Sequence, residues 1–293
     1  MKRNQLIALH EAARGNSRLV HAVLEADSEL KCLHKASGPL SSQWSLSVQK
    51  TVWQARKTLL RGIEYPAADV QALTLADDDY PAQLRTISCP PAVLYYRGDI
   101  SIVQTRLQLA VVGSRKPGHY AVAALNRLIP NGVPAQTVII SGLAGGIDGL
   151  AHRLALKEGF RTAAVLGHGH RTCYPAENRQ LKERLEQDEL VISEYPPNIK
   201  PERWMFPERN RIISGLADAV LVVSAAGRSG SLITAETALE QGREVLAVPG
   251  SPGEAAVEGC NELIRDGAGL ISKPIHLSEE LEACLRRKSC LTN

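Results

Sequence analysis

The chain has 293 residues, of which 44% are hydrophobic and 22% are charged, and its formal net charge is only +3. A chain of this length can bury enough apolar surface to fold without disulfides or metals. The small net charge excludes a uniformly basic nucleic-acid-binding surface, so any such site must be local. No stretch reaches the roughly 18 apolar residues of a membrane span, and no apolar leader follows Lys2-Arg3. We therefore expect a cytoplasmic protein with no membrane contact.

Six cysteines are scattered along the chain without a CxxC pair. In a cytoplasmic protein this distribution is typical of free thiols. None of the eight histidines stands at ligand spacing from a cysteine pair, so we expect no metal site.

The first 64 residues have the apolar spacing of short amphipathic helices. One helix is expected around Leu6, a second begins near Leu19, and a third spans residues 48–60 after a break rich in Ser, Gly and Pro. We predict a small helical domain at residues 1–64 and a larger domain at residues 65–293.

A turn-rich connector follows and ends in an expected strand at residues 93–96. From residue 107 onward, apolar runs of strand length alternate with helical patterns of about ten residues. These runs occupy residues 107–112, 137–140, 163–166, 190–192, 219–223 and 245–248. Continuous apolar runs are typical of strands that are buried on both faces. The pattern predicts an α/β fold with an extended Rossmann-like, mostly parallel sheet and helices on both faces.

Three of these runs lead into glycine-rich loops that precede helical patterns. The first loop starts at Gly113-Ser114-Arg115-Lys116, the second contains Gly142, Gly145 and Gly146, and the third spans residues 227–231. A turn of this kind exposes backbone N–H groups at a helix N-terminus, and such groups bind phosphate. Because the carboxyl ends of parallel strands meet at one edge, we expect the three loops to line a common phosphate site.

The loops lack the usual cofactor-binding motifs. The first loop is not GxGxxG, and the second strand ends at Ser141, where an NAD site would carry Asp or Glu. No GKS or GKT of a Walker A phosphate loop occurs in the chain. We therefore predict that the protein holds no cofactor.

An enzyme that processes a nucleotide or a nucleotide-sugar is an alternative interpretation. Asp148 and His152 lie four residues apart near a helix start, so they can share one face, and Glu236 lies early in the helix after the third loop. These side chains offer a general acid and base. The simpler interpretation is that Asp148 interacts with its helix terminus and that His152 is a packed helix residue.

The segment at residues 201–215 combines two of the scarce aromatic residues, Trp204 and Phe206, with Arg209 and Arg211. Aromatic rings stack on unpaired bases and arginines bind phosphates, so this mixture indicates a single-stranded nucleic acid. We expect the segment to overhang the glycine loops.

The same segment also has an interpretation without a ligand. Phe206 then packs beneath the loop, and Arg209 forms an ion pair with Glu194 or Glu208. In either case we expect a helix that begins near Glu208.

These motifs resemble those of the DNA-processing protein A family (DprA, also called Smf). In chain order they read VVGSR, SGLAGGIDGLAH, SEY, FPERNRIISGL, SGSLITAE, VPG and GCNELIRDGA, and the resemblance covers about residues 80–271. It implies a non-enzymatic protein that binds and protects incoming single-stranded DNA, loads RecA recombinase in natural transformation, and forms a homodimer. The N-terminal helices are similar in position to the family's SAM-like accessory domain.

The loops and the resemblance together give the candidates for DNA binding. They are Gly113, Ser114, Arg115, Lys116, Gly142, Gly145, Gly146, Phe206, Arg209, Asn210, Arg211, Gly227, Arg228, Ser229, Gly230 and Ser231.

Two positions depart from the family's pattern. Relatives often carry a lysine after the Tyr-Pro pair, where this chain has Ala176, and they commonly end the strand before the third loop in Val-Glu-Ala, where this chain has Ser224. The first departure reduces the positive charge expected around the DNA. The sequence resembles the short form of the family, without a C-terminal winged helix.

Overall fold

The computed structural model describes residues 2–34, 40, 42–61, 69–104, 107–227 and 229–291. These residues form two compact units that are interleaved along the chain. The first unit comprises Met1–Arg97, Gly167–Thr172 and Ile192–Glu202, and the second comprises Gly98–Leu166, Cys173–Val191 and Arg203–Asn293. The predicted boundary between residues 64 and 65 lies outside the described residues, so the division into 1–64 and 65–293 stays a prediction.

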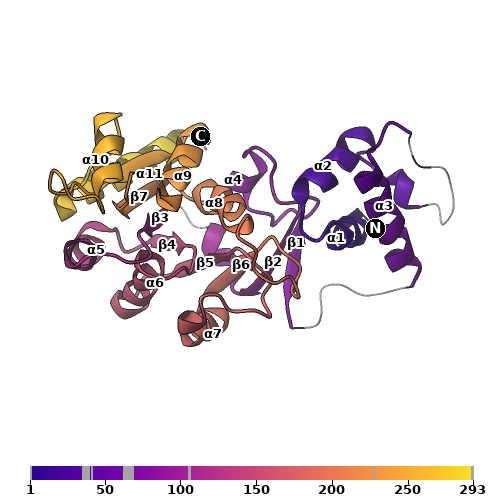
Figure 1. Cartoon of the computed structure of the whole chain (residues 1–293), viewed down its shortest axis with the longest axis horizontal. Helices are drawn as coiled ribbons and strands as arrows, with labels where there is room; N and C mark the ends of the chain where they lie inside the picture. The colour runs from indigo at the N-terminus through magenta and orange to yellow at the C-terminus, as the bar shows by residue number, and fades with distance from the viewer. Residues whose placement is uncertain are drawn as a thin grey trace. The chain divides into compact units, whose positions relative to one another are not determined.

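The first unit opens with the helices drawn in indigo and violet in Figure 1. They are α1 (Lys2–Ala12), α2 (Ser17–Ala26), the 3₁₀ helix η1 (Lys31–Leu33) and α3 (Leu46–Leu60). Asn16 and Ser45 cap α2 and α3, because their side chains accept the N–H groups of Leu19 and Val48. The apolar faces of the helices share one core, as their spacing predicts.

A short antiparallel pair completes the regular structure of this unit. Strand β1 (Gln71–Thr74) pairs with β2 (Val93–Gly98), and the single helical turn α4 (Ala82–Arg85) lies between them in the chain. The strand expected at residues 93–96 is therefore confirmed, whereas β1 was not expected.

A buried tyrosine links α1 to β2. The hydroxyl of Tyr95 donates a hydrogen bond to Oε1 of Glu11 at 3.0 Å, and Tyr95 is fully buried. Burial raises the pKa of Glu11 to about 7, although the bond from Tyr95 opposes the shift. Folding therefore favours the protonated form of this carboxyl group.

The second unit alternates strands and helices. In chain order its elements are η2 (Ile100–Gln104), β3 (Leu107–Gly113), α5 (His119–Gly132), β4 (Thr137–Ser141), α6 (Ile147–Glu158), β5 (Thr162–Leu166), η3 (Ala176–Asn178), α7 (Arg179–Asp188), α8 (Met205–Leu216), β7 (Ala219–Ser224), α9 (Gly230–Glu240), β8 (Glu244–Ala247), α10 (Glu258–Arg265), β9 (Gly269–Leu270) and α11 (Pro274–Leu291). Strand β6 (Leu190–Ser193) spans the point where the chain passes between the units.

The strands of the second unit run in the order β5-β4-β3-β7-β8-β9, and each of these pairs is parallel. With β1, β2 and β6 they give a nine-stranded, mostly parallel sheet. Every residue of β4, β5 and β7 is buried, as continuous apolar runs predict. The predicted α/β class and Rossmann-like sheet are confirmed.

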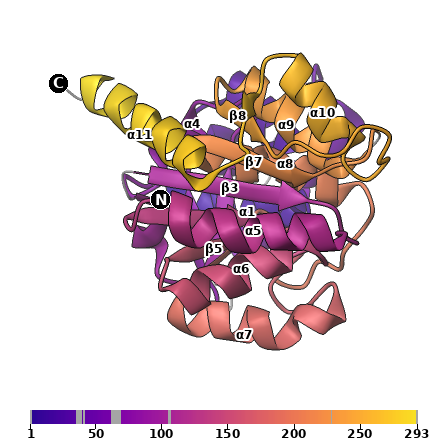
Figure 2. The same cartoon turned by 90° about the vertical axis from the view of Figure 1, so that its left-hand side faces the viewer.

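Helices cover both faces of this part of the sheet. Figure 2 shows α5 and α6 on one side of β3, and α8 and α9 on the other. Side chains of α5, α6 and α11 form the main core with β3, β4 and β7, including Leu125, Ile147, Leu277, Leu109 and Leu221. Because the helices cover the faces of the sheet, its edge at the carboxyl ends of the strands is formed by the connecting loops.

Helix α8 begins earlier than predicted. The sequence indicated a start near Glu208, but the helix starts at Met205 and includes Phe206 and Pro207. Proline is tolerated in the first turn, because the N–H that it lacks would have no partner within the helix there. Phe206 therefore projects from a helix rather than from a loop.

None of the described helices combines the length and the apolar run needed to cross a membrane. The described residues also contain no cluster of His, Cys, Asp or Glu side chains that could hold a metal ion. None of the six cysteines, all of which the structure describes, forms a disulfide bond.

Candidate functional site

The strand order reverses direction beside β3. The chain leaves β3 to build β4 and β5 on one side, and it later returns to build β7 on the other side. Ligands of such sheets bind at this reversal, outside the carboxyl ends of the strands. A pocket of about 640 Å³ lies there, and the loops after β3 and β7 and helix α8 contribute to its lining.

The structure brings many of the predicted site residues together in this pocket. Those that line it are Gly113, Ser114, Arg115, Phe206, Arg209, Asn210, Ser229, Gly230 and Ser231. Those that are described but lie outside its lining are Lys116, Gly142, Gly145, Gly146, Arg211 and Gly227. Arg228 is outside the described residues.

Two further aromatic and basic residues line the pocket and were missing from the predicted set. Tyr174 belongs to the Tyr-Pro motif, and Arg203 directly precedes Trp204. The motif and the neighbouring tryptophan were available signals, but the sequence did not show that the chain leads both side chains to the same place.

The first loop is a hydrogen-bonded turn that presents an exposed arginine. The N–H of Ser114 donates to Oγ of Ser224 at 3.2 Å, and Oγ of Ser114 accepts the N–H of Lys116 at 3.1 Å. The side chains of Arg115 and Lys116 are exposed. Ser224 therefore helps to fix the backbone that carries Arg115.

Phe206 lies between an arginine and a tyrosine. The guanidinium carbon of Arg115 is 5.7 Å from the centre of the Phe206 ring, and the ring of Tyr174 is 5.5 Å away at an angle of 41°. The cation is held over the ring face by the ring's quadrupole. The ring is half-buried and remains part of the pocket wall, so an aromatic base can pack against this cluster.

The second loop already binds a carboxyl group of the protein itself. The N–H of Gly142 donates to Oδ2 of Asp148 at 3.2 Å, and Asp148 is buried. Burial raises the pKa of Asp148, whereas Arg209 and the N–H groups of Ala144 and Gly142 favour its ionised form. Asp148 therefore holds the loop that leads into its own helix, which agrees with the simpler, structural interpretation of this residue.

Arg209 also forms hydrogen bonds with the second loop. Its guanidinium is buried and donates from Nη1 to the carbonyl oxygen of Gly142 at 2.5 Å and to that of Val165. A side chain with these contacts joins α8 to the ends of β4 and β5. Its geometry suits positioning of the pocket walls, although Arg209 also lines the pocket.

A glycine permits the first and second loops to touch. Gly146 has φ +73°, and a Cβ atom placed there would lie 2.3 Å from the carbonyl oxygen of Ser114. Such a distance is a steric clash, and the positive φ disfavours other residues as well. Gly146 therefore allows the close approach of the two loops, and its predicted contact with DNA stays a prediction.

The third loop presents the N-terminus of α9. Ser229 is the N-cap residue, and Gly230 and Ser231 begin the helix at the pocket wall. Asn210 of α8 donates from Nδ2 to the carbonyl oxygen of Gly230 at 3.3 Å, which fixes this helix end. The partial positive charge of a helix N-terminus attracts phosphate.

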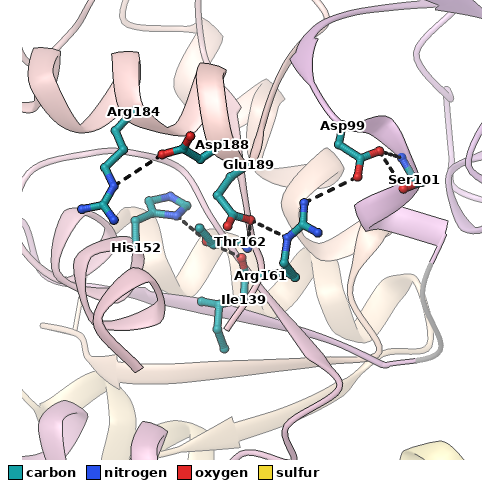
Figure 3. Close-up of polar contacts among 9 residues, drawn as sticks. All are labelled: Asp99, Ser101, Ile139, His152, Arg161, Thr162, Arg184, Asp188 and Glu189. Atoms are coloured by element: carbon teal, nitrogen blue, oxygen red, sulfur yellow. Dashed lines mark hydrogen bonds and ion pairs between the residues drawn. The ribbon is translucent and has the colours of Figure 1, made fainter. Parts of the chain in front are cut away.

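The three side chains of the alternative enzyme hypothesis do not meet. Asp148 lines the pocket, but Glu236 is exposed on α9 and lies outside the lining. Figure 3 shows the His152 ring directed to Thr162, with Nδ1 2.7 Å from the threonine hydroxyl. That hydroxyl donates to the carbonyl of Ile139, so it accepts a hydrogen bond from Nδ1–H, which assigns the proton of the neutral ring to Nδ1.

His152 belongs to a buried structural network. Oε2 of Glu189 accepts both the N–H of Thr162 and Nε of Arg161 at 3.0 Å (Figure 3). Burial lowers the pKa of His152 to about 3, with Arg153 and Arg209 contributing. A histidine that stays neutral in this network anchors β5 and is not a proton-transfer group of the pocket.

Comparison with known proteins gives a consistent result. The family model described as DNA recombination-mediator protein A matches residues 71–282. The chain is 42% identical to the DNA processing protein DprA of Bacillus subtilis over 217 residues, which cover 74% of this chain and 73% of that relative. It is 45% identical to the protein Smf of Escherichia coli over 205 residues, which cover 69% of this chain and 54% of that relative.

Two solved structures resemble the whole or most of the chain. The X-ray structure of DprA from Streptococcus pneumoniae superposes with a TM-score of 0.81 at 34% identity, covering 95% of this chain and 98% of that one. DprA from Helicobacter pylori, whose structure is described in terms of its single-stranded DNA binding mode, gives a TM-score of 0.65 at 28% identity and covers 74% of this chain and 97% of that one.

Proposed function

The chain belongs to the DNA recombination-mediator protein A family, and we propose that it binds single-stranded DNA in the pocket beside β3. The observation that carries the proposal is the cluster at the pocket wall: the exposed guanidinium of Arg115 lies 5.7 Å from the ring centre of Phe206. One group suits a backbone phosphate and the other suits the face of a base. The N-terminus of α9, which also lines the pocket, adds backbone N–H groups for phosphate.

The cluster favours single-stranded over double-stranded DNA. Base faces are accessible only where bases are unstacked, and side chains such as Phe206 and Tyr174 offer surfaces for them. The net charge of the chain is only +3, so a long duplex gains little from the remaining surface. The likeness to the H. pylori protein supports the same ligand.

Family membership supports a wider role. We propose that the protein protects incoming single-stranded DNA, loads RecA recombinase onto it during natural transformation, and acts as a homodimer in the cytoplasm without chemistry of its own. Arg115, Phe206 and the loop at residues 227–231 then hold the strand while the recombinase assembles.

Fluorescence anisotropy with labelled oligonucleotides tests the binding. We expect tight binding to oligo-dT, weak binding to a duplex, and an affinity that falls steeply with salt because phosphate contacts release counterions. Arg115→Glu should nearly abolish binding, whereas Arg127→Glu, an exposed arginine of α5 outside the pocket, should change it little. The absence of binding to oligo-dT at low salt would refute the proposal.

Phe206→Ala tests whether a base stacks in the pocket. The loss of one stacked base should weaken binding by about 1–3 kcal/mol and leave the salt dependence nearly unchanged. If the affinity of the variant instead depends less on salt, the ring contributes by positioning Arg115 at a phosphate and not by stacking on a base.

The wider role needs its own measurement. Purified protein should shorten the lag of RecA assembly on oligonucleotides, and Arg115→Glu should remove this effect. Analytical ultracentrifugation should give twice the 31.7 kDa mass of one chain. A monomer at all concentrations would contradict the homodimer.

A further inference from the structure

We propose that the outer face of α3 is a docking site for an acidic amphipathic helix of a partner protein. Helix α3 belongs to the first unit, and none of the residues that line the pocket beside β3 lies on it. The inference therefore adds a protein partner to the proposed function and is tested separately from it. Five residues form this face and are called the α3 seam: Leu46, Lys50, Trp53, Lys57 and Leu60.

The α3 seam exposes three large apolar side chains. Leu46 is 75% exposed, Trp53 is 52% exposed and Leu60 is 66% exposed. A single exposed apolar side chain needs no explanation, but a row of them along one helix marks an interaction surface. The opposite face of α3 packs in the core of the first unit through residues such as Val48 and Val52. The helix therefore presents apolar groups on two sides, and its own unit covers only one of them.

The spacing of the α3 seam is that of a helix that packs along another helix. Its residues are separated by four, three, four and three positions, as the a and d positions of a heptad repeat are. Residues seven apart drift by only about 20° around a helix, so the three apolar side chains point to one side. The α3 seam rises about 21 Å along the helix axis. A row this long and this narrow suits a second helix, whereas a membrane surface requires a wider apolar face.

The charges of the α3 seam specify the chemistry of the partner. Lys50 and Lys57 alternate with the apolar residues, and α3 contains no aspartate or glutamate. The ammonium group of Lys57 lies 3.5 Å from the centre of the Trp53 ring, so one positive charge is held directly at the apolar row. A partner helix with carboxylates opposite these lysines gains complementary charge along the same line that buries its apolar side chains.

Other occupants fit the α3 seam less well. A second copy of α3 offers lysines of the same sign and no carboxylate. Single-stranded DNA can use the lysines and the ring of Trp53, but it leaves Leu46 and Leu60 in water at the two ends of the seam. A helix covers both leucines, and the burial of apolar side chains is the larger gain.

Anisotropy with two labelled synthetic peptides tests the inference on the full chain. The first is an amphipathic peptide of about 20 residues, long enough to form a helix, with leucine at every d position and glutamate at the neighbouring a, e and g positions. The second has lysine in place of every glutamate. We expect the acidic peptide to bind at least about tenfold more tightly than the basic one, and added salt should reduce this difference.

Three variants locate the binding. Lys50→Glu/Lys57→Glu should weaken binding of the acidic peptide at least about tenfold and strengthen binding of the basic one. The matched control is Arg127→Glu/Lys157→Glu, which makes the same change of charge at exposed positions of α5 and α6 and should keep the preference of the unmodified protein. Trp53→Ala should weaken binding of the acidic peptide about tenfold, because it removes the central apolar side chain.

The outcomes separate this inference from the proposed function. If the unmodified protein binds both peptides alike, or if the control variant loses as much affinity as the Lys50→Glu/Lys57→Glu variant, the inference is wrong. It is also wrong if that variant binds oligo-dT more weakly and keeps its affinity for the acidic peptide, because the α3 seam then binds DNA. Arg115→Glu should lose oligo-dT and keep the acidic peptide. Binding of the acidic peptide without binding of oligo-dT would support the inference and refute the proposed function.

Urea unfolding checks that the variants are folded. The side chains of Lys50 and Trp53 are exposed, so their variants should unfold at the midpoint of the unmodified protein. The comparison of the two peptides on the unmodified protein decides the inference even if a variant is less stable.

Discussion

The carboxylate of Asp148 accepts the N–H of Gly142 at 3.2 Å, in the kind of glycine turn where other proteins bind a phosphate. The protein thus supplies its own anion to the second loop, and Arg209 supplies the opposing charge. Of the three glycine loops, the first and third are left for an external ligand.

Asp148→Ala should destabilise the protein by about 3–5 kcal/mol, because it removes the buried carboxyl group that accepts the Gly142 N–H and attracts the charge of Arg209. Asp148→Asn keeps the shape and a hydrogen-bond acceptor, so its cost should be smaller, about 1–3 kcal/mol. Urea unfolding measures both values. If Asp148→Ala keeps its stability and binds inorganic phosphate more tightly, the second loop is a phosphate site after all.

Gly146→Ala tests the contact between the first and second loops. The variant combines a positive φ with a clash at 2.3 Å against the carbonyl oxygen of Ser114, so we expect a loss of several kcal/mol and weaker DNA binding. Gly242→Ala is the matched control, because Gly242 has φ +69° but open space around its Cβ position. It should cost only about 1 kcal/mol. If both variants lose the same stability, the close contact between the first and second loops at Gly146 does not contribute to the fold.

Ser224→Ala tests how the turn that carries Arg115 is fixed. The substitution removes the acceptor of the Ser114 N–H at a buried position, so it should cost about 1 kcal/mol of stability. A looser turn should also weaken oligo-dT binding severalfold, as anisotropy would measure. An unchanged affinity together with lower stability would mean that Arg115 is held without this bond.

Glu11 makes the stability of the first unit depend on pH. Its folded pKa of about 7 lies above the ordinary 4.5, so its protonated form stabilises the fold fully below pH 4.5, and this contribution is lost as the pH rises through about 7. Glu11→Gln mimics the protonated form and should be more stable than the unmodified protein at pH 8 by about 1–3 kcal/mol, but not at pH 4.5.

Urea unfolding with tryptophan fluorescence detects this difference in a Trp204→Phe background. The remaining tryptophans, Trp44 and Trp53, both lie in the first unit and report its unfolding. If the free energy of unfolding changes with pH in the same way for Glu11→Gln and for its Trp204→Phe parent, the prediction is wrong.

Periodicity alone was sufficient to predict the buried strands of the sheet. Runs such as 219–223 are apolar at every position, and only a strand buried on both faces requires that pattern, so β7 was found within one residue. The start of α8 was missed because a proline in the first helical turn was read as part of a loop. Short strands such as β1 lack a pattern long enough to be distinguished from turns.

The sequence predicted only part of the site, because the remaining residues depend on contacts between distant parts of the chain. Local motifs identified Arg115 and Phe206, whereas the role of Arg209 depends on carbonyl oxygens that come from residues 142 and 165. The same holds for Arg203, whose place in the pocket follows from the path of the chain before α8. Such partners are set by packing, which one sequence does not display.

The bonds that hold the pocket, from Gly142 to Asp148 and from Ser114 to Ser224, join groups of the protein itself. A binding site whose backbone is already ordered loses little conformational entropy when it is filled. Encounter with DNA is then governed by diffusion and by the charges of the arginines, and it should be fast for every oligonucleotide. Sequences of different affinity should therefore differ mainly in residence time on the protein.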